Sequence, residues 1–298
     1  MVIEEIPGAE AARALRRKHH RQYVARRIGV YVAAVLAALL CAGPFLWSAI
    51  TSFKQNRDLY DPTKNPFIFN RPPTPDHVTY LFTDTAYLTF AWNTLWVGVL
   101  VVLITLVLGL PAAYALARLD RPWSGPLGIG IFLVYLVPPS LLFLSLSRMV
   151  VAIGLQDSTW SLVLVYPTIT IPVSIWLLMG FLKGIPRDIE EQAMVDGYSR
   201  LGAFVRAVVP LMFPGIVAVV VFAFTLTASE FIYALAFVAP TDSMPVSTGV
   251  PTQLVRGDVF FWQSLQAATV LVAVPIAFVF NLFLDKFVAG FTQGAVKG

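Results

Sequence analysis

Acidic residues cluster in one short segment, KGIPRDIEEQAMVDGYSRLGAFVRAVVP, at positions 183–210. Three carboxylates follow Pro186, an order typical of a helix start, because proline fits the first turn and negative charge stabilises the helix N-terminus. Gly197 allows a sharp break, and a second helix is expected to begin near Ser199. The segment is therefore predicted to form two short surface helices joined at a glycine.

Residues that could form a metal or nucleotide site are scattered or missing from the sequence. His19, His20 and His77 lie apart, Cys41 is the single cysteine, and there is no HExxH pattern. The chain has no GxxxxGK[ST] phosphate-binding loop and no Gly-Lys pair. We expect no metal and no cofactor on this chain, which cannot supply an ATP site through such a loop.

The composition indicates which kind of helices flank this charged segment. The chain is 57% hydrophobic and only 13% charged, whereas soluble domains carry about 25% charged residues. Six apolar stretches reach the roughly 20 residues that a membrane-spanning helix needs. We therefore predict an all-α integral membrane protein with six transmembrane helices, at about 28–50, 86–117, 123–147, 159–182, 207–239 and 260–284.

The Lys and Arg residues predict the orientation. Fifteen of the 21 lie in the terminal segments and connections that six spans place on one side: 1–27, 118–121, 183–206 and 285–298. An excess of Lys and Arg marks the cytoplasmic side, so both termini are predicted to be cytoplasmic. Topology and anionic lipid explain the basic leader 1–27, and no nucleic acid is expected. Residues 28–285 then form the membrane domain and 286–298 a cytoplasmic tail.

The charged segment also resembles a known family. Glu191, Ala193 and Gly197, with Pro210 thirteen residues after the glycine, resemble the "EAA" loop of permeases in importers of the ATP-binding-cassette (ABC) superfamily, although Gln192 stands where alanine is usual. In that family the loop is a coupling helix that docks into a groove on the ATPase subunit. The resemblance implies coupling roles for Glu190, Glu191, Ala193, Asp196, Gly197 and Pro210.

Further segments are similar to the maltose-type carbohydrate permeases. They are AWNTLWVGVL at 91–100, GLPAAYALARL at 109–119 and the tail FTQGAVKG at 291–298. The resemblance implies the type I ABC importer permease fold in the bacterial inner membrane. It also implies a second permease subunit, an ATPase dimer that binds ATP and Mg²⁺, an extracytoplasmic solute-binding protein and a carbohydrate substrate. The tail residues Gly294, Lys297 and Gly298 would lie at the ATPase interface.

Two polar connections are predicted on the external side. Residues 51–85 are rich in Pro, Asp and Asn, and their X-Pro steps favour an extended course. Residues 240–258 resemble in position the loop that relatives insert into their binding protein, and their Pro and Gly content suits a protruding loop. Pro138 and Pro139, midway in the third span, are expected to bend it.

Residues that could contact a substrate lie within or beside the spans. Glu230 is the one ionisable residue well inside a predicted span, and such residues are functional candidates, although a helix–helix hydrogen bond is the alternative. Aromatic rings stack on sugars and amides bind hydroxyls, although Trp and Tyr also favour membrane interfaces. The candidates are Trp92, Asn93, Tyr135, Glu230, Tyr233, Trp262 and Gln263.

Two other functions compete with an importer permease. A secondary transporter or channel would show inverted repeats and several intramembrane charges, and neither is found in the sequence. A membrane enzyme would need clustered catalytic groups, whereas only Arg148 and Glu230 lie near the interior of a span. We therefore expect a non-catalytic permease subunit.

Overall fold

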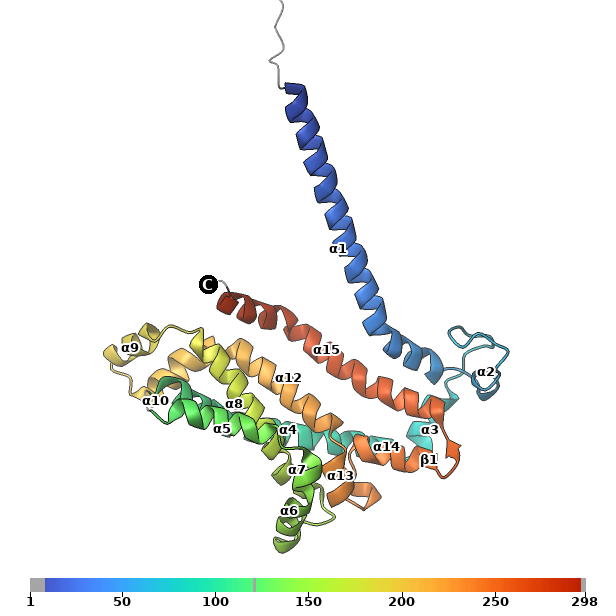
Figure 1. Cartoon of the computed structure of the whole chain (residues 1–298). Coiled ribbons are helices and arrows are strands. Elements are labelled where there is room, and N and C mark those ends of the chain that lie inside the picture. The colour runs from blue at the N-terminus through green and yellow to red at the C-terminus, as the bar shows by residue number, and fades with distance from the viewer. Residues whose placement is uncertain (1–8, 120–121, 296–298) are drawn as a thin grey trace, which may run out of the picture.

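A computed structural model describes residues 9–119 and 122–295, with side chains described for 22–119 and 122–283. The described chain consists of helices, one short hairpin and the connections between them (Figure 1). Its elements are α1 Ala9–Ser52, α2 Asn56–Leu59, α3 Asp76–Thr83, α4 Tyr87–Arg118, α5 Ser124–Tyr135, α6 Pro139–Ala152, α7 Thr159–Val165, α8 Pro167–Lys183, α9 Asp188–Val195, α10 Arg200–Ala203, the π-helix η1 Phe204–Val208, α11 Val209–Leu211, α12 Phe213–Ser229, α13 Ile232–Phe237, the 3₁₀-helix η2 Thr241–Ser243, α14 Val246–Leu254, β1 Val255–Arg256, β2 Val259–Phe260 and α15 Trp262–Ala295.

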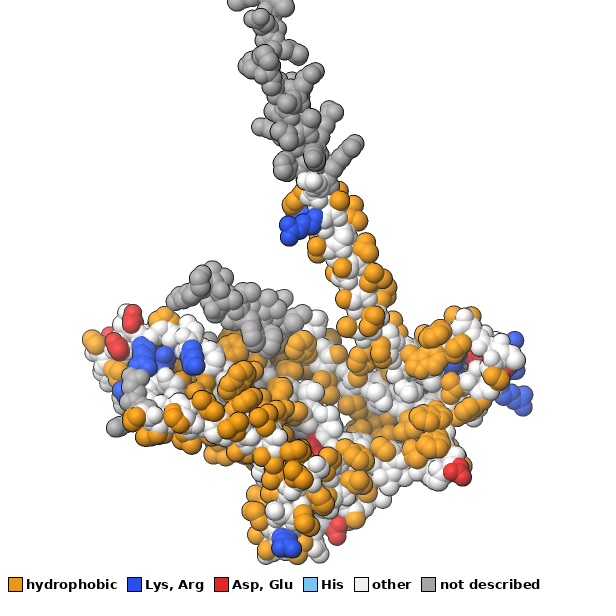
Figure 2. Space-filling view, in the orientation of Figure 1, with side chains coloured by type: hydrophobic (Ala, Val, Ile, Leu, Met, Phe, Trp, Pro, Cys, Tyr) orange, Lys and Arg blue, Asp and Glu red, His pale blue; other side chains and the backbone are white. Residues whose placement is uncertain are grey.

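Four described helical stretches are long and apolar enough to cross a membrane: Gln22–Ser52, Tyr87–Arg118, Thr159–Lys183 and Trp262–Phe283. Two bent pairs meet the same test together, α5 with α6 and α10–α11 with α12, which raises the count to six. Charged side chains gather at the ends of the molecule, and the surface between them is mainly hydrophobic (Figure 2). The predicted all-α membrane architecture is confirmed, while the orientation of the termini stays a prediction.

The third predicted span, 123–147, is not one straight helix. Its two halves, α5 and α6, meet at 92°. Pro138 has extended backbone, with φ −60° and ψ 136°, and Pro139 begins α6. Neither proline has an N–H to continue the ladder of α5, so the prolines that predicted a bend produce a full break.

The fifth predicted span, 207–239, is also divided. Helix α12 ends at Ser229, Glu230 has extended backbone with ψ 128°, and α13 follows. At the other end, α12 is bent by 75° from the α10–α11 stretch, at Met212. The expectation that Glu230 lies inside a continuous helix is therefore wrong, because its carboxylate instead accepts backbone N–H groups freed at the start of α13.

Helix α4 forms the centre of the packed bundle. It lies against α8 and α12 along its length, and Thr105 of α4 shares a 2.7 Å hydrogen bond with Thr170 of α8. Gly98 allows the close approach of α12, because a Cβ there would lie 2.6 Å from the ring of Phe224. Small residues at such crossings let helix backbones pack closely in membranes.

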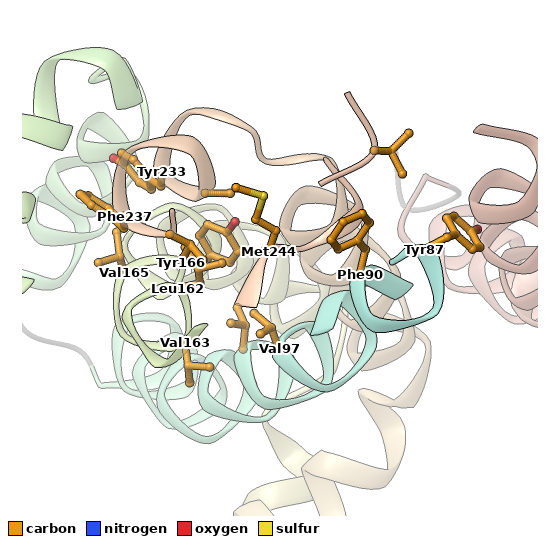
Figure 3. Close-up of a cluster of buried hydrophobic side chains, with 14 of the residues drawn as sticks. Tyr87, Phe90, Val97, Leu162, Val163, Val165, Tyr166, Tyr233, Phe237 and Met244 are labelled. Atoms are coloured by element: carbon orange, nitrogen blue, oxygen red, sulfur yellow. The ribbon is translucent and has the colours of Figure 1, made fainter. Parts of the chain in front are cut away.

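A buried cluster surrounds the end of α4 that begins at Tyr87. Figure 3 shows Phe90 on α4, with Tyr166 and Tyr233 gathered farther along the same cluster. A second cluster, with Leu178, Phe204 and Met212, surrounds the end of α4 near Arg118. The two clusters hold α4 at both ends against helices that are distant in sequence.

The connection 51–85 folds around a buried charge pair. Lys54 Nζ lies 3.6 Å from Asp58 Oδ2, and both side chains are inaccessible to solvent. The Asn70 side chain donates to Asp58 Oδ1 at 2.8 Å, and its backbone N–H donates to Oδ2 at 3.2 Å. Burial opposes ionisation of Asp58, but the Asn70 hydrogen bonds and the Lys54 charge outweigh it and lower the pKa below its ordinary value of 3.8.

The connection 240–258 is mostly packed, not protruding as expected. Residues 246–254 form α14, which lies against α4 and α15. Gly249 allows this contact, because a Cβ there would lie 2.6 Å from the Phe90 ring. The β1–β2 hairpin, with its turn at Gly257, and residues 240–242 are exposed.

The terminal helices extend beyond their predicted bounds. Helix α1 is continuous through the predicted boundary at residue 27, and α15 continues past residue 284. The best membrane-spanning window of α1 is 0% buried within the chain, and Figure 1 shows α1 leading away from the other helices. Gly294 lies in the last turn of α15, while Lys297 and Gly298 lie outside the described residues.

The Asp58 pair predicts an acid-sensitive fold. Because the pKa of Asp58 is lowered in the folded state, its stabilising effect is present above pH 4 and is lost as the pH falls below about 4. Asp58→Asn should lower the thermal unfolding temperature in detergent at pH 7 and make it less dependent on pH between about 5 and 3. Asp258→Asn is the control, because Asp258 is exposed in the hairpin turn. Equal pH profiles for wild type and Asp58→Asn would contradict the assignment.

Candidate functional site

The charged segment has the predicted helix–glycine–helix form. Helix α9 ends in a Schellman motif, in which Gly197 N–H donates to the Met194 carbonyl and Tyr198 N–H to the Ala193 carbonyl, each at 3.1 Å. Gly197 has φ 95°, a left-handed conformation that glycine adopts without strain. Ser199 then caps α10, with its side chain accepting Gly202 N–H at 3.1 Å.

The predicted coupling residues divide between two faces of this unit. Glu191, Asp196 and Gly197 are exposed. Glu190 and Ala193 are buried against the rest of the chain, at 7% and 8% exposure. Helix periodicity turns positions 190 and 193 inward while position 191 faces out, and the coupling role of these residues stays a prediction.

Glu190 faces the end of α4. Its Oε1 lies 2.6 Å from Arg118 Nε, and its Oε2 accepts a 2.9 Å hydrogen bond from the Tyr114 hydroxyl. Sequence reasoning missed Tyr114 and Arg118, although both stand in the GLPAAYALARL segment that carries part of the resemblance.

Exposed apolar side chains accompany the outward carboxylates. They are Val195 at 87%, Leu201 at 71%, Val205 at 52% and Tyr198 at 41% exposure. Their sequence signal is the presence of apolar residues within a charged segment. The sequence alone does not say which face of the helices these residues occupy. Together with Glu191 and Asp196 they define a surface that we call the α9–α10 face.

Pro210 lies at the other end of this unit. It is exposed, in the short helix α11 that follows the π-helix η1. Pro210 has no N–H to donate to a preceding carbonyl, and the wide turn of η1 and the bend at Met212 lie on either side of it. Its position fits a role in directing the chain from the α9–α10 face into α12.

A cavity of about 440 Å³ lies where three helical segments are interrupted. The interruptions are the α5–α6 break, the α7–α8 junction at Tyr166 and the α12–α13 break at Glu230. Interrupted backbone at membrane depth is tolerated where protein or a water-filled cavity satisfies it. The lining residues are Val134, Tyr135, Leu136, Val137, Pro139, Leu142, Tyr166, Thr168, Ile169, Thr170, Leu226, Thr227, Ser229, Glu230 and Tyr233.

Three predicted substrate-pathway residues meet at this cavity: Tyr135, Glu230 and Tyr233. The Glu230 carboxylate accepts backbone N–H groups from Tyr233 at 3.0 Å and Ala234 at 3.2 Å, so the N-terminus of α13 stabilises its charge. The hydroxyls of Tyr166 and Tyr233 are buried at this cavity. Neither hydroxyl has a hydrogen bond of good geometry within the described residues.

The other four predicted residues do not line this cavity. The Asn93 amide donates to the carbonyls of Asp242 and Met244 at 2.8 and 3.0 Å, and Gln263 donates to Asn56 at 2.9 Å. Trp92 is 63% exposed on the outside of α4, and Trp262 stacks on Phe260. The geometry gives Asn93 and Gln263 structural roles, and a substrate role for these four stays a prediction.

Several cavity residues were not predicted from the sequence. Tyr166, Thr168 and Thr227 are polar groups in otherwise apolar spans. Pro167, directly after Tyr166, is a signal for the α7–α8 junction, since a proline removes a backbone donor. These polar groups come together only because α8 and α12 pack against each other. The sequence of a single span does not specify that packing.

The comparisons with known proteins agree on one family. Residues 86–293 match the family described as binding-protein-dependent transport system inner membrane component. The chain is 33% identical to a sulfoquinovosyl glycerol transport system permease protein of Agrobacterium fabrum, covering 90% of this chain and 93% of the relative. It is 30% identical to a trehalose/maltose transport system permease protein of Thermococcus litoralis, covering 93% and 99%.

A solved structure shares the fold. It is a bacterial ABC transporter involved in the import of the acidic polysaccharide alginate, matched with a TM-score of 0.72 and 17% identity over 88% of this chain and 97% of that chain. These matches favour the importer permease over the secondary transporter or channel. The chain therefore belongs to the binding-protein-dependent transport system inner membrane component family, the membrane permease subunits of ABC importers.

Proposed function

We propose that this chain forms one half of the membrane pathway of a carbohydrate importer. A solute-binding protein delivers the sugar, and separate ATPase subunits bind ATP and Mg²⁺ and supply the energy. The α9–α10 face carries this proposal, because it joins exposed apolar side chains and carboxylates on a rigid two-helix unit. The curated relatives, which are named as permeases for sugar derivatives and disaccharides, support it.

The α9–α10 face is the proposed ATPase contact. Val195 and Leu201 would be buried in a groove of the partner, while Glu191 and Asp196 would pair with Lys or Arg at its rim. Apolar side chains at the centre and charges at the rim are typical of protein interfaces. The tail residues Gly294, Lys297 and Gly298 are proposed to reach the same ATPase dimer.

A second permease subunit would cover the unpacked helix surfaces. The membrane-spanning window of α1 is 0% buried within its own chain. A groove of about 950 Å³, lined mainly by apolar residues of α12, α14 and α15, lies open beside α15. Subunit contacts in a membrane depend on close van der Waals packing of such surfaces, so we assign the groove to the partner subunit.

The 440 Å³ cavity is the proposed sugar contact on this subunit. Its tyrosine, threonine and serine hydroxyls suit the hydroxyl groups of a sugar. Among its described lining residues Glu230 is the charged one, and none is Lys or Arg. An anionic sugar about 4 Å from Glu230 would be repelled by about 4 kcal/mol at an effective dielectric constant near 20. We therefore propose a neutral sugar as the substrate.

Two substitutions on the α9–α10 face test coupling. Gly197→Pro removes the N–H that donates to Met194 and cannot adopt φ 95°, and Glu191→Lys reverses an exposed charge. Each should lower sugar uptake into proteoliposomes, per ATP hydrolysed, by about tenfold or more. Asp84→Lys is the control, because it reverses an exposed carboxylate on another part of the molecule. Normal coupled uptake by Glu191→Lys and Gly197→Pro would refute the assignment.

The charge of the cavity is tested with two sugars. Proteoliposomes with the native partner subunits should take up trehalose in preference to anionic sulfoquinovosyl glycerol, and Glu230→Gln should reduce that preference by about tenfold. Glutamine keeps an oxygen that can accept an α13 N–H, so the helix start is preserved. Binding-protein-stimulated ATP hydrolysis should be unchanged. Equal preference in wild type and variant would exclude Glu230 as a selectivity residue.

A further inference from the structure

The coupling unit has a side-chain connection to a span that is not its neighbour in sequence. Helix α9 follows α8 along the chain, and α10 leads through η1 and α11 into α12. Motion of α9 therefore reaches α8 and α12 through the backbone. Helix α4 has no such covalent link to α9, yet its last turn lies against it through Arg118 and Glu190.

This contact combines one ion pair with two hydrogen bonds. Arg118 Nε lies 2.6 Å from Glu190 Oε1, and Arg118 Nη2 donates to the Ile185 carbonyl, just before α9, at 2.7 Å. The Tyr114 hydroxyl donates to Glu190 Oε2 at 2.9 Å. The Tyr114 ring also packs on Phe204 of η1, with centroids 4.4 Å apart. Tyr114 and Arg118 thus bind both halves of the coupling unit to one turn of α4.

The ion pair is buried, which distinguishes it from a surface contact. The side chains of Arg118 and Glu190 are 8% and 9% exposed. Breaking a buried pair leaves an uncompensated charge and is strongly unfavourable, so α9 cannot separate from α4 without a large loss. Because the Arg fork holds both Glu190 and the Ile185 carbonyl, it also restrains how α9 can rotate.

Helix α4 then leads to the opposite end of the molecule. It is helical for 32 residues from Tyr87 to Arg118, about 48 Å at 1.5 Å per residue. Near its start, Asn93 binds the carbonyls of Asp242 and Met244, and Thr94 accepts the N–H of Val246 at 2.9 Å. The same helix therefore holds the coupling unit at one end and the 242–246 segment at the other.

We propose that Tyr114, Arg118 and Glu190 form a buried clamp that makes α4 move with the coupling helix, and that α4 carries this displacement to the 242–246 segment. The proposal rests on the proposed docking of an ATPase on the α9–α10 face. Glu190 is then a positioning residue that acts through α4, while Glu191, its exposed neighbour, contacts the partner directly. The two adjacent glutamates have different tasks.

The test uses the assembled complex in proteoliposomes, with the sugar uptake per ATP hydrolysed as the readout. Glu190→Gln and Arg118→Gln should each lower this ratio by about tenfold, while the ATPase subunits still co-purify. Tyr114→Phe, which keeps the ion pair and the ring contact, should lower it by about threefold. The charge exchange Glu190→Arg with Arg118→Glu should restore at least a third of the ratio lost in the single variants.

The outcomes separate this clamp from a structural role and from the docking proposal. Normal uptake per ATP in Glu190→Gln, with Glu191→Lys still uncoupled, would overturn the clamp and leave the docking intact. Lower yield and lower thermal stability with a normal ratio in the purified complex would also overturn it. Failure of any ATPase to co-purify with the wild-type chain would instead refute the docking proposal itself.

Discussion

Backbone hydrogen bonding is the constraint on which the rest of this structure depends. Within a bilayer an unpaired N–H or C=O costs several kcal/mol, so a span must stay helical unless something else satisfies its backbone. Helix α4 stays helical from Tyr87 to Arg118, although Pro111 inside it has no N–H to donate to the ladder. The α5–α6, α7–α8 and α12–α13 interruptions converge on the 440 Å³ cavity. Three interruptions thus meet where polar groups gather, whereas the bend at Met212 lies apart from this cavity.

The same constraint governs the charges. Glu230 is stabilised by the N–H groups of α13, Asp58 by Asn70 and Lys54, and Glu190 by Arg118 and Tyr114. Each of these three carboxylates lies beside a helix end or a connection, not in the middle of an unbroken helix. A charge away from water needs partners. The partners of Glu190 lie far from it in sequence, those of Glu230 hold the α12–α13 break, and those of Asp58 hold the 51–85 connection.

The sequence predicts the span positions well, because hydropathy depends only on local composition. It also predicts the α9–Gly197–α10 unit, because capping and the left-handed glycine are local rules. The sequence does not predict features that depend on how the helices pack against one another. Adjacent glutamates 190 and 191 look alike in the sequence, yet one turns to α4 and the other to solvent. The connection 240–258 reads as a polar loop, yet the match of Gly249 to Phe90 folds it onto α4.

The low burial of α1 has a consequence for biogenesis. No residue of the spanning window of α1 is buried within the described chain, although α1 contacts α15, so hydropathy is the main term that places this helix in the membrane. It can therefore be inserted and oriented as soon as it is synthesised, before the rest of the subunit exists. Lateral association with other helices belongs to a later stage. Membrane insertion of α1 and the later packing of the subunit are thus separate steps.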